Sequence, residues 1–135
     1  MLDTSAAVAL LVAEDRDHAR CVELADELEE QLVVPSSTLV EIDYWLRKLG
    51  AVQGWQRFVE ETAEGRYRLY PGDEQDVLRA AELEVTHAAV DLGFVDASVV
   101  ATCERLGETK VATLDRRHFS VVRPRHCEAL TLLPT

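Results

Sequence analysis

The fold is decided by one stretch near the end of the chain, Gly93-Phe-Val-Asp-Ala-Ser-Val-Val-Ala-Thr-Cys-Glu-Arg-Leu-Gly107, and by its continuation, Val111-Ala-Thr-Leu-Asp115. Apolar residues recur three, four and seven positions after Asp96, which predicts a helix with one buried face. Asp96 shares that face, where a carboxylate is costly unless it is paired or coordinated. The continuation is typical of a short buried strand, and it ends in a second carboxylate. The stretch therefore predicts a helix and a strand that bring two acids together.

Short apolar runs alternate with helical patterns along the rest of the chain. Strand-like runs lie at residues 1–2, 32–34, 67–70, 111–114 and 130–133, and helical patterns at 6–13, 18–30, 36–49, 52–63, 74–90 and from 96. This alternation predicts the α/β class, as a three-layer sandwich whose central, mainly parallel sheet of about four or five strands is flanked by helices. Without a repeat or linker, residues 1–135 form one domain.

The periodicity also predicts which side chains of two helices face the core. In the helix at 36–49 they are Leu39, Ile42, Trp45, Leu46 and Leu49. In the helix at 74–90 they are Val77, Leu78, Ala81, Leu83 and Val85.

The composition is that of an ordinary globular protein, with 47% apolar and 29% charged residues in a chain of 135. No apolar run is long enough to cross a membrane, and the first residues lack the basic and apolar segments of a secretory signal, so we expect a cytoplasmic protein. The three cysteines are widely spaced, with no Cys-x-x-Cys pair. This spacing argues against a disulfide framework and a structural zinc site.

The net charge of −11 argues against a nucleic-acid partner, but the charges are unevenly distributed. Residues 1–34 are strongly acidic, whereas the basic residues of 105–126 follow or surround Asp115: Arg105, Lys110, Arg116, Arg117, Arg123 and Arg125. They form either a basic surface beside Asp115 or an ordinary solvated face.

Four carboxylates are predicted to meet at one edge of the sheet. Asp3 and Asp115 each end a strand, and the carboxyl ends of parallel strands share an edge where ligands bind. Glu41 lies in the second turn of the helix after the second strand, at the same edge. Asp96 reaches this edge only if the loop 91–95 carries it across. Four such charges repel one another unless a cation offsets them. Mg²⁺ and Mn²⁺ prefer oxygen ligands, so either ion would suit this site. The bound ion would also activate water for attack on a phosphodiester.

Two of the four acids, Asp3 and Glu41, also have a structural alternative. Asp3 precedes a helix and could cap it, since short polar side chains satisfy the free N–H groups of a helix start. Thr38 and Glu41 have the spacing of a capping box, in which both side chains bond to backbone N–H groups. Asp43 and Asp91 are near two of the predicted site residues, and we interpret both as surface acids.

Four motifs, in order, resemble those of PIN-domain ribonucleases, and most closely the VapC-type toxins of bacterial type II toxin–antitoxin systems. They are Leu2-Asp-Thr-Ser-Ala6, Val34-Pro-Ser-Ser-Thr-Leu-Val-Glu41, Val95-Asp-Ala-Ser-Val-Val-Ala101 and Ala112-Thr-Leu-Asp-Arg-Arg-His-Phe119. The resemblance implies cleavage of RNA by a water nucleophile at an acidic site that binds Mg²⁺ or Mn²⁺. It also implies a homodimer and a cognate antitoxin whose C-terminal segment occupies the active-site groove.

The resemblance assigns roles to individual residues. Asp3 and Asp96 are the expected primary metal ligands, and Glu41 and Asp115 complete the acidic site and orient the water or a second ion. Ser5 and Thr113 match the small hydroxyl positions that support the site.

The residues around the acids carry further expectations. We expect Arg116 and Arg117 to hold the RNA backbone. His118 either protonates a leaving oxygen or is a hydrogen-bonded loop residue. The chain departs from the family in having only Met1 and Leu2 before Asp3, so we expect Asp3 to be the least rigidly placed of the four acids.

Two other function classes are compatible with acids at a parallel-sheet edge. A phosphoacceptor signalling domain carries paired acids at its first strand and a lysine after its last, whereas Asp3 stands alone and Lys110 precedes its strand. A non-catalytic binding module would use the groove only to hold a partner peptide. The four acids together favour the ribonuclease over both.

Overall fold

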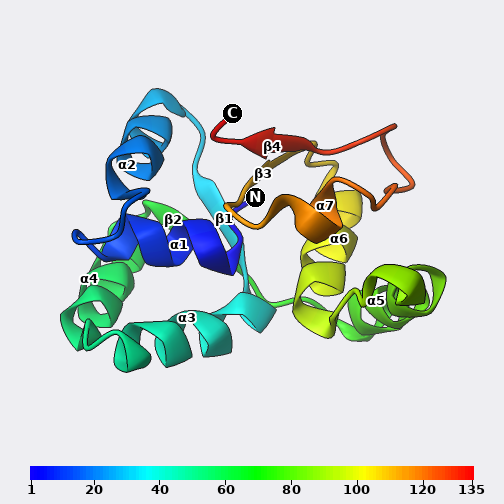
Figure 1. The fold of residues 1–135 in the computed structure, drawn as a ribbon, viewed down its shortest axis with the longest axis horizontal. Coiled ribbons are helices and arrows are strands. Elements are labelled where there is room, and N and C mark those ends of the chain that lie inside the picture. Colours follow the sequence, from blue (N-terminus) through cyan, green and yellow to red (C-terminus); the bar gives the residue numbers. More distant parts are fainter.

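The computed structural model describes all 135 residues, and its strands lie side by side in the middle of the molecule (Figure 1). The strands are β1 (Leu32–Pro35), β2 (Tyr67–Tyr70), β3 (Lys110–Ala112) and β4 (Thr131–Leu133). β1 pairs with β2 and β3 pairs with β4, both in parallel. Leu2 connects the two pairs, because its N–H donates to the Val33 carbonyl over 2.8 Å and it forms a parallel bridge with Ala112. The order β2-β1-Leu2-β3-β4 confirms the predicted parallel sheet.

The helices follow the predicted order, with small differences at their ends and with one addition, α7, in a segment that was expected to be a loop. They are α1 (Thr4–Leu11), α2 (His18–Glu27), α3 (Ser36–Lys48), α4 (Val52–Ala63), α5 (Glu74–Thr86), the 3-10 turn η1 (Ala88–Val90), α6 (Phe94–Leu106) and α7 (Arg116–Phe119). The helix predicted at 74–90 ends at Thr86, because η1 and the left-handed Asp91 (φ 55°) redirect the chain toward α6. Asp and Asn adopt that conformation more readily than most other residues.

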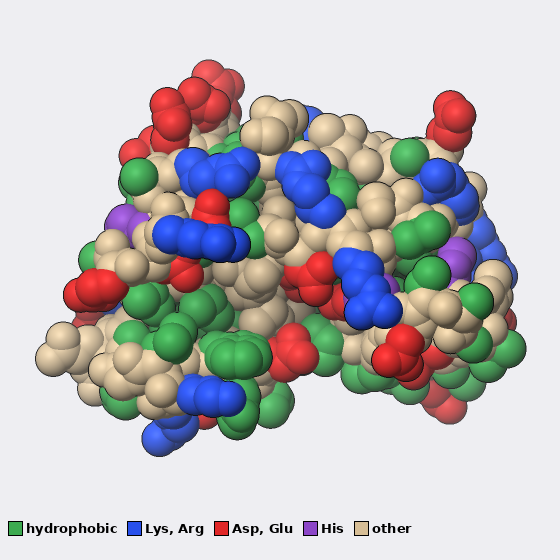
Figure 2. Space-filling model, viewed as in Figure 1, with side chains coloured by type: hydrophobic (Ala, Val, Ile, Leu, Met, Phe, Trp, Pro, Cys, Tyr) green, Lys and Arg blue, Asp and Glu red, His purple; other side chains and the backbone are tan.

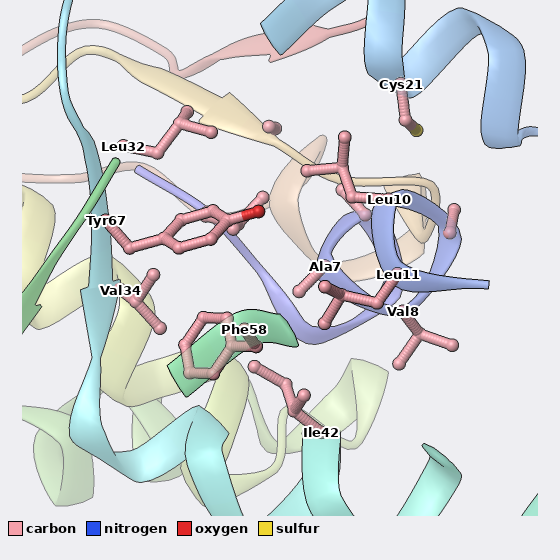
Figure 3. Packing of buried hydrophobic residues seen from close by; sticks show 14 of the residues in the cluster. Ala7, Val8, Leu10, Leu11, Cys21, Leu32, Val34, Ile42, Phe58 and Tyr67 are labelled. Carbon is pink, nitrogen blue, oxygen red and sulfur yellow. The ribbon is translucent and has the colours of Figure 1, made fainter. Parts of the chain in front are cut away.

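Helices cover both faces of the sheet, as a three-layer sandwich requires. Alternate residues of β1 belong to different core clusters: Leu32 and Val34 pack with α1, α3 and α4, whereas Val33 packs with α5 and α6. Figure 3 shows the first cluster, in which Phe58 of α4 packs on Tyr67 of β2 with ring centroids 4.9 Å apart. Burial on both faces explains why β1 is a continuous apolar run.

The prediction of inward-facing residues was wrong at several positions of α3 and α5. Trp45 and Leu49 of α3 are 41% and 54% exposed, and the buried positions are Thr38, Ile42 and Leu46. On α5 the exposed residues are Val77, Leu78, Ala81 and Val85, and Ala80 and Leu83 are buried. Both helices contact the core through a narrower stripe than their apolar residues suggest.

The sheet also fixes where the functional side chains lie. α1 begins directly after Asp3 and α3 directly after Pro35, so both helix starts lie at the carboxyl edge of the sheet. None of the helices combines the length and apolar character that a membrane-spanning segment needs.

Candidate active site

A cavity of about 480 Å³ at the carboxyl edge of the sheet is lined by all four predicted acids, Asp3, Glu41, Asp96 and Asp115. Figure 2 shows acidic atoms in a hollow near the centre of this face, with Lys and Arg side chains around it. None of the four carboxylates forms an ion pair with a lysine or arginine. The structure therefore gathers four carboxylates here without pairing any of them with a lysine or an arginine.

Asp3 is firmly held, contrary to the expectation from its short strand. Its backbone N–H donates to the Ala112 carbonyl over 3.0 Å, and Leu2 is bonded to the strands on both sides. Its Oδ2 accepts hydrogen bonds from the hydroxyls of Ser5 and Thr113, each over 2.8 Å. The side chain makes no capping bond to α1, although Asp3 occupies the cap position. The capping alternative for Asp3 was therefore wrong, and its free Oδ1 can face the cavity.

Glu41 is tied to the start of α1 rather than to its own helix. The hydroxyl of Thr4 donates to Glu41 Oε1 over 2.9 Å. The hydroxyl of Thr38 donates to the Pro35 carbonyl over 2.8 Å, so the capping box of Thr38 and Glu41 does not form. Thr4 was not predicted as a site residue. Its position directly after Asp3 was the only feature of the sequence that could have indicated this role.

Asp96 reaches the cavity because His118 holds it there. His118 Nδ1 lies 2.5 Å from Asp96 Oδ2, and Nε2 lies 3.0 Å from the carbonyl oxygen of Val90 in η1. A carbonyl oxygen only accepts hydrogen bonds, so Nε2 carries a proton and donates a hydrogen bond to the Val90 carbonyl. The ring thereby joins α7 to both ends of the segment from η1 to the first turn of α6. This contact meets the condition that the loop 91–95 carries Asp96 to the sheet edge.

The environment of Asp96 disfavours its charged form. Burial raises the pKa of this carboxyl, and the nearby charges of Asp3 and Asp115 raise it further, although the contact with His118 acts in the opposite direction. Burial is the main cause and the two neighbouring carboxylates add to it, so a bound cation would favour the charged form of Asp96.

Asp115 is exposed and begins α7. Its Oδ1 accepts the backbone N–H of Arg117 over 3.1 Å, so the carboxylate caps this short helix while it lines the cavity. Thr113 and Ser5 hold the turn: Asp115 N–H donates to Thr113 Oγ1 over 3.1 Å, and Leu114 N–H donates to Ser5 Oγ over 2.9 Å. The two hydroxyls therefore connect the Asp3 and Asp115 ends of the site.

The chemistry of the cavity fits a hard divalent cation. Its charged donors are carboxylate oxygens, the ligands that Mg²⁺ and Mn²⁺ prefer. No three acidic, histidine or cysteine side chains are drawn together tightly enough to form a complete ligand set. Mg²⁺ usually binds through one or two carboxylates and keeps several waters, so an open arrangement of this kind is compatible with it.

The predicted basic surface is smaller than the sequence suggests. Arg105 pairs with Asp73 and Asp76, Lys110 with Glu30, and Arg125 with Glu82. Arg116 donates to the carbonyls of Leu132 and Pro134 at the end of β4, whereas Arg117 is exposed and forms no ion pair. Asp43 pairs with Arg47 on the surface, and Asp91 is exposed.

Arg16 and Trp45, like Thr4, line the cavity and were missed as functional candidates. Arg16, whose side chain is 94% exposed, is the only lysine or arginine that lines it, and Trp45 lines it from α3. Arg16 lies in the α1–α2 loop, and no motif in the sequence indicates where that loop folds.

Comparisons with known proteins agree with the geometry. The model of the PIN domain family matches residues 1–123. Ribonuclease VapC26 of Mycobacterium tuberculosis is 31% identical over 134 residues, which cover 99% of both chains. The crystal structure of VapC20 from the same species, described as a sarcin–ricin-loop-cleaving toxin, matches with a TM-score of 0.82 at 20% identity and covers 93% of this chain and 96% of that one.

Proposed function

Since the chain belongs to the PIN-domain family and is a VapC-type ribonuclease toxin, not a signalling domain or a binding module, we propose that it cleaves RNA at the cavity lined by Asp3, Glu41, Asp96 and Asp115. The observation that carries this proposal is the convergence of four carboxylates, from distant parts of the chain, on one cavity without a lysine or arginine partner. Such an arrangement is unfavourable for stability alone, and a bound divalent cation would offset its negative charge.

Divalent-metal dependence is general among PIN-domain ribonucleases, and the proposal for this chain is Mg²⁺ or Mn²⁺ held by Asp3 and Asp96, directly or through water. When bound, such an ion lowers the pKa of water and stabilises charge on the phosphate. Glu41 and Asp115 complete the acidic site and orient the attacking water. Ser5 and Thr113 fix Asp3 through its Oδ2, which leaves Oδ1 as the oxygen available to the ion.

His118 is proposed as a positioning residue. Both of its ring nitrogens already have partners, Asp96 and the Val90 carbonyl, so the ring is not free to turn toward a leaving oxygen. Its proposed contribution is the orientation of the Asp96 carboxylate.

The RNA backbone is proposed to contact arginines at the rim of the cavity. Arg117 has a free guanidinium two residues after Asp115, and Arg16 lines the cavity, where its Nε pairs with Asp17 over 3.1 Å. Arginine forms charge-assisted hydrogen bonds with phosphate, which position the RNA without reading its sequence. Arg116 retains a smaller part of this role, because its guanidinium is bonded to the end of β4.

The proposed protein partners are those of a VapC-type toxin: a cognate antitoxin whose C-terminal segment fills the active-site groove, and a second copy of the chain. Exposed apolar side chains of α3 and α5 offer a surface for the second copy; they are Val40, Tyr44, Val77 and Leu78. We place the activity in the cytoplasm, as the sequence predicts.

RNA cleavage by the purified, antitoxin-free protein tests this function. Transfer and ribosomal RNA are incubated with Mg²⁺, Mn²⁺ or EDTA, and with the Asp96→Asn variant. We expect cleavage with metal and loss of cleavage with EDTA or with the variant, whose circular dichroism spectrum stays that of the wild type. A protein that cuts no RNA with either metal, together with unchanged growth inhibition by Asp96→Asn, would refute the proposal.

A further inference from the structure

The cavity also contains an exposed indole, which its acidic character does not explain. Trp45 is 41% exposed and lines the same cavity as the four carboxylates. It follows Glu41 by four residues on α3, so the two side chains lie on the same side of the helix, about 6 Å apart along its axis. Trp45 is not among the side chains packed against the core clusters. Its large apolar surface is therefore available to a ligand in the cavity.

The indole is supported from the side away from the cavity. Lys48 Nζ lies 5.0 Å from the centre of the Trp45 ring, and the Tyr44 ring meets Trp45 edge to face with centroids 5.4 Å apart. Neither Lys48 nor Tyr44 lines the cavity. A cation over the ring and an edge-to-face neighbour each stabilise the orientation of an aromatic side chain. The ring is thus held in place while its cavity side stays open.

We propose that Trp45 stacks on an unpaired nucleobase of the RNA substrate, next to the phosphate that lies over the carboxylates; this inference rests on the proposed ribonuclease function. A nucleotide joins the two chemistries that the cavity presents, because it has an anionic phosphate for a cation-loaded acidic site and a flat π face for an indole. Single-stranded RNA is commonly bound in this way, by bases that stack on aromatic side chains.

The fluorescence of Trp45 provides a readout that does not depend on cleavage. Trp55 is the only other tryptophan and packs against the core, so a Trp55→Phe variant leaves Trp45 as the single reporter. This variant is titrated in Ca²⁺, a cation that also takes oxygen ligands and here replaces Mg²⁺, with a ten-nucleotide single-stranded RNA and with an abasic ribose–phosphate oligomer of the same length. We expect quenching by the RNA and much weaker quenching by the abasic oligomer, because only the first can stack.

Kinetics of the full chain supply the second measurement. Trp45→Ala should raise KM roughly ten- to hundredfold, the usual effect of losing one stacked base. It should leave kcat close to the wild-type value, because stacking contributes equally to the bound substrate and the transition state. The KM of Trp45→Phe, which keeps a smaller ring, should lie between those of the wild type and Trp45→Ala. This variant also keeps the test valid if Trp45→Ala does not fold. Val59→Ala on α4, a truncation of a residue that is 50% exposed, is the matched control and should change neither constant.

The outcomes separate this inference from the proposed function. If the wild type cleaves RNA while Trp45→Ala leaves KM unchanged and RNA fails to quench Trp45, stacking is refuted and the ribonuclease function stands. If the wild type cleaves no RNA with any metal, the function itself fails and the inference with it. If Trp45→Ala weakens only antitoxin binding, the indole belongs to the protein partner, and the inference is overturned.

Discussion

Helix α6 carries two carboxylates in contrasting environments. Glu104, in its third turn, accepts hydrogen bonds from Arg79 Nε over 2.8 Å, from Arg79 Nη2 over 3.0 Å and from the backbone N–H of Arg125 over 2.9 Å. Burial raises the pKa of Glu104, but these contacts outweigh it and lower the pKa below the ordinary value. Asp96, in the first turn, has no arginine or lysine partner, and its pKa is raised.

The difference shows how one helix serves both stability and function. On the α5–α6 side, carboxylates are matched with arginines, so the charges help to hold the helices together. At the sheet edge, carboxylates are gathered and left unmatched, which is costly for stability and, under the proposed function, would supply negative charge for a cation. Changes to the two regions should therefore have opposite effects on stability and on activity.

The largest effect is expected at Asp3. Asp3→Asn keeps the shape of the side chain and an oxygen that can accept the hydroxyls of Ser5 and Thr113, but it removes the charge. Cleavage should fall by more than about 100-fold, since even residues that only support metal ligands contribute roughly 10- to 100-fold. The melting temperature in EDTA should not fall, because one source of repulsion is removed.

Cleavage rates with Mg²⁺ and thermal unfolding in EDTA measure the two effects of Asp3→Asn. Ser98→Ala serves as a control for small polar changes near this edge, because Ser98 lies outside the acidic cavity and bonds to Ser37. An Asp3→Asn variant that is less stable and retains its activity would contradict the separation of the two regions.

Two substitutions of His118 distinguish positioning from proton transfer. The amide of asparagine can reach the place of Nδ1 and keep the contact with Asp96, whereas that of glutamine reaches the place of Nε2 and keeps only the Val90 contact. We expect kcat to fall roughly 10- to 100-fold in His118→Gln and clearly less in His118→Asn. Single-turnover cleavage provides the measurement. Equal losses in both variants would instead point to the ring proton as the group that matters.

Glu104→Gln should show the opposite behaviour to Asp3→Asn. Loss of charge-assisted hydrogen bonds to Arg79 should lower stability at pH 7 by about 1–2 kcal/mol, or roughly 3–8 °C in melting temperature. Cleavage by the folded variant should be unchanged, since Glu104 does not line the cavity. Glu82→Gln is the matched control, because Glu82 is 57% exposed and its ion pairs should contribute little.

The pH dependence of this difference follows from the lowered pKa. A carboxyl whose pKa is lower in the folded state stabilises the protein above its unfolded pKa, here near the ordinary value of 4.5, and loses this contribution as the pH falls through the folded value. The gap in unfolding free energy between wild type and Glu104→Gln should therefore be largest at neutral pH and shrink below about pH 4.5. A gap that stays constant down to pH 3 would show that the charge of Glu104 is not its cause.

Much of the site could be predicted because it follows from the sheet. The carboxyl ends of parallel strands share an edge, which brings Asp3 and Asp115 together, and a helix that starts at that edge adds Glu41. Asp96 was less certain, since its position depends on contacts of His118 with residues 22 and 28 positions away in the sequence. Contacts of that kind leave no periodic signal.

The errors have a common physical origin. A helical pattern shows which residues share a face, but not how wide a stripe the neighbouring elements cover. Trp45 and Ile42 have the same apolar character, yet Ile42 is buried and Trp45 lies on the cavity wall. Charge density along the sequence likewise failed to show that Arg105 and Arg125 are matched with acids of α5.

The smallest effect on RNA cleavage is expected from substitution of the arginines near Asp115. These substitutions test whether the arginines without an acidic partner are the ones that contact RNA. Arg117→Ala should raise KM several-fold and reduce the slope of log affinity against log salt by about 0.7, the value for one lost phosphate contact of a single strand. Arg116→Ala should change this slope less, because its guanidinium is bonded to the end of β4. Arg125→Ala, which removes an arginine paired with Glu82, is the control and should leave the slope unchanged. Binding titrations at several salt concentrations supply the slopes. Equal slope changes for all three variants would mean that RNA binding depends on the overall charge of the protein. The difference between paired and unpaired charges would then not apply to the arginines.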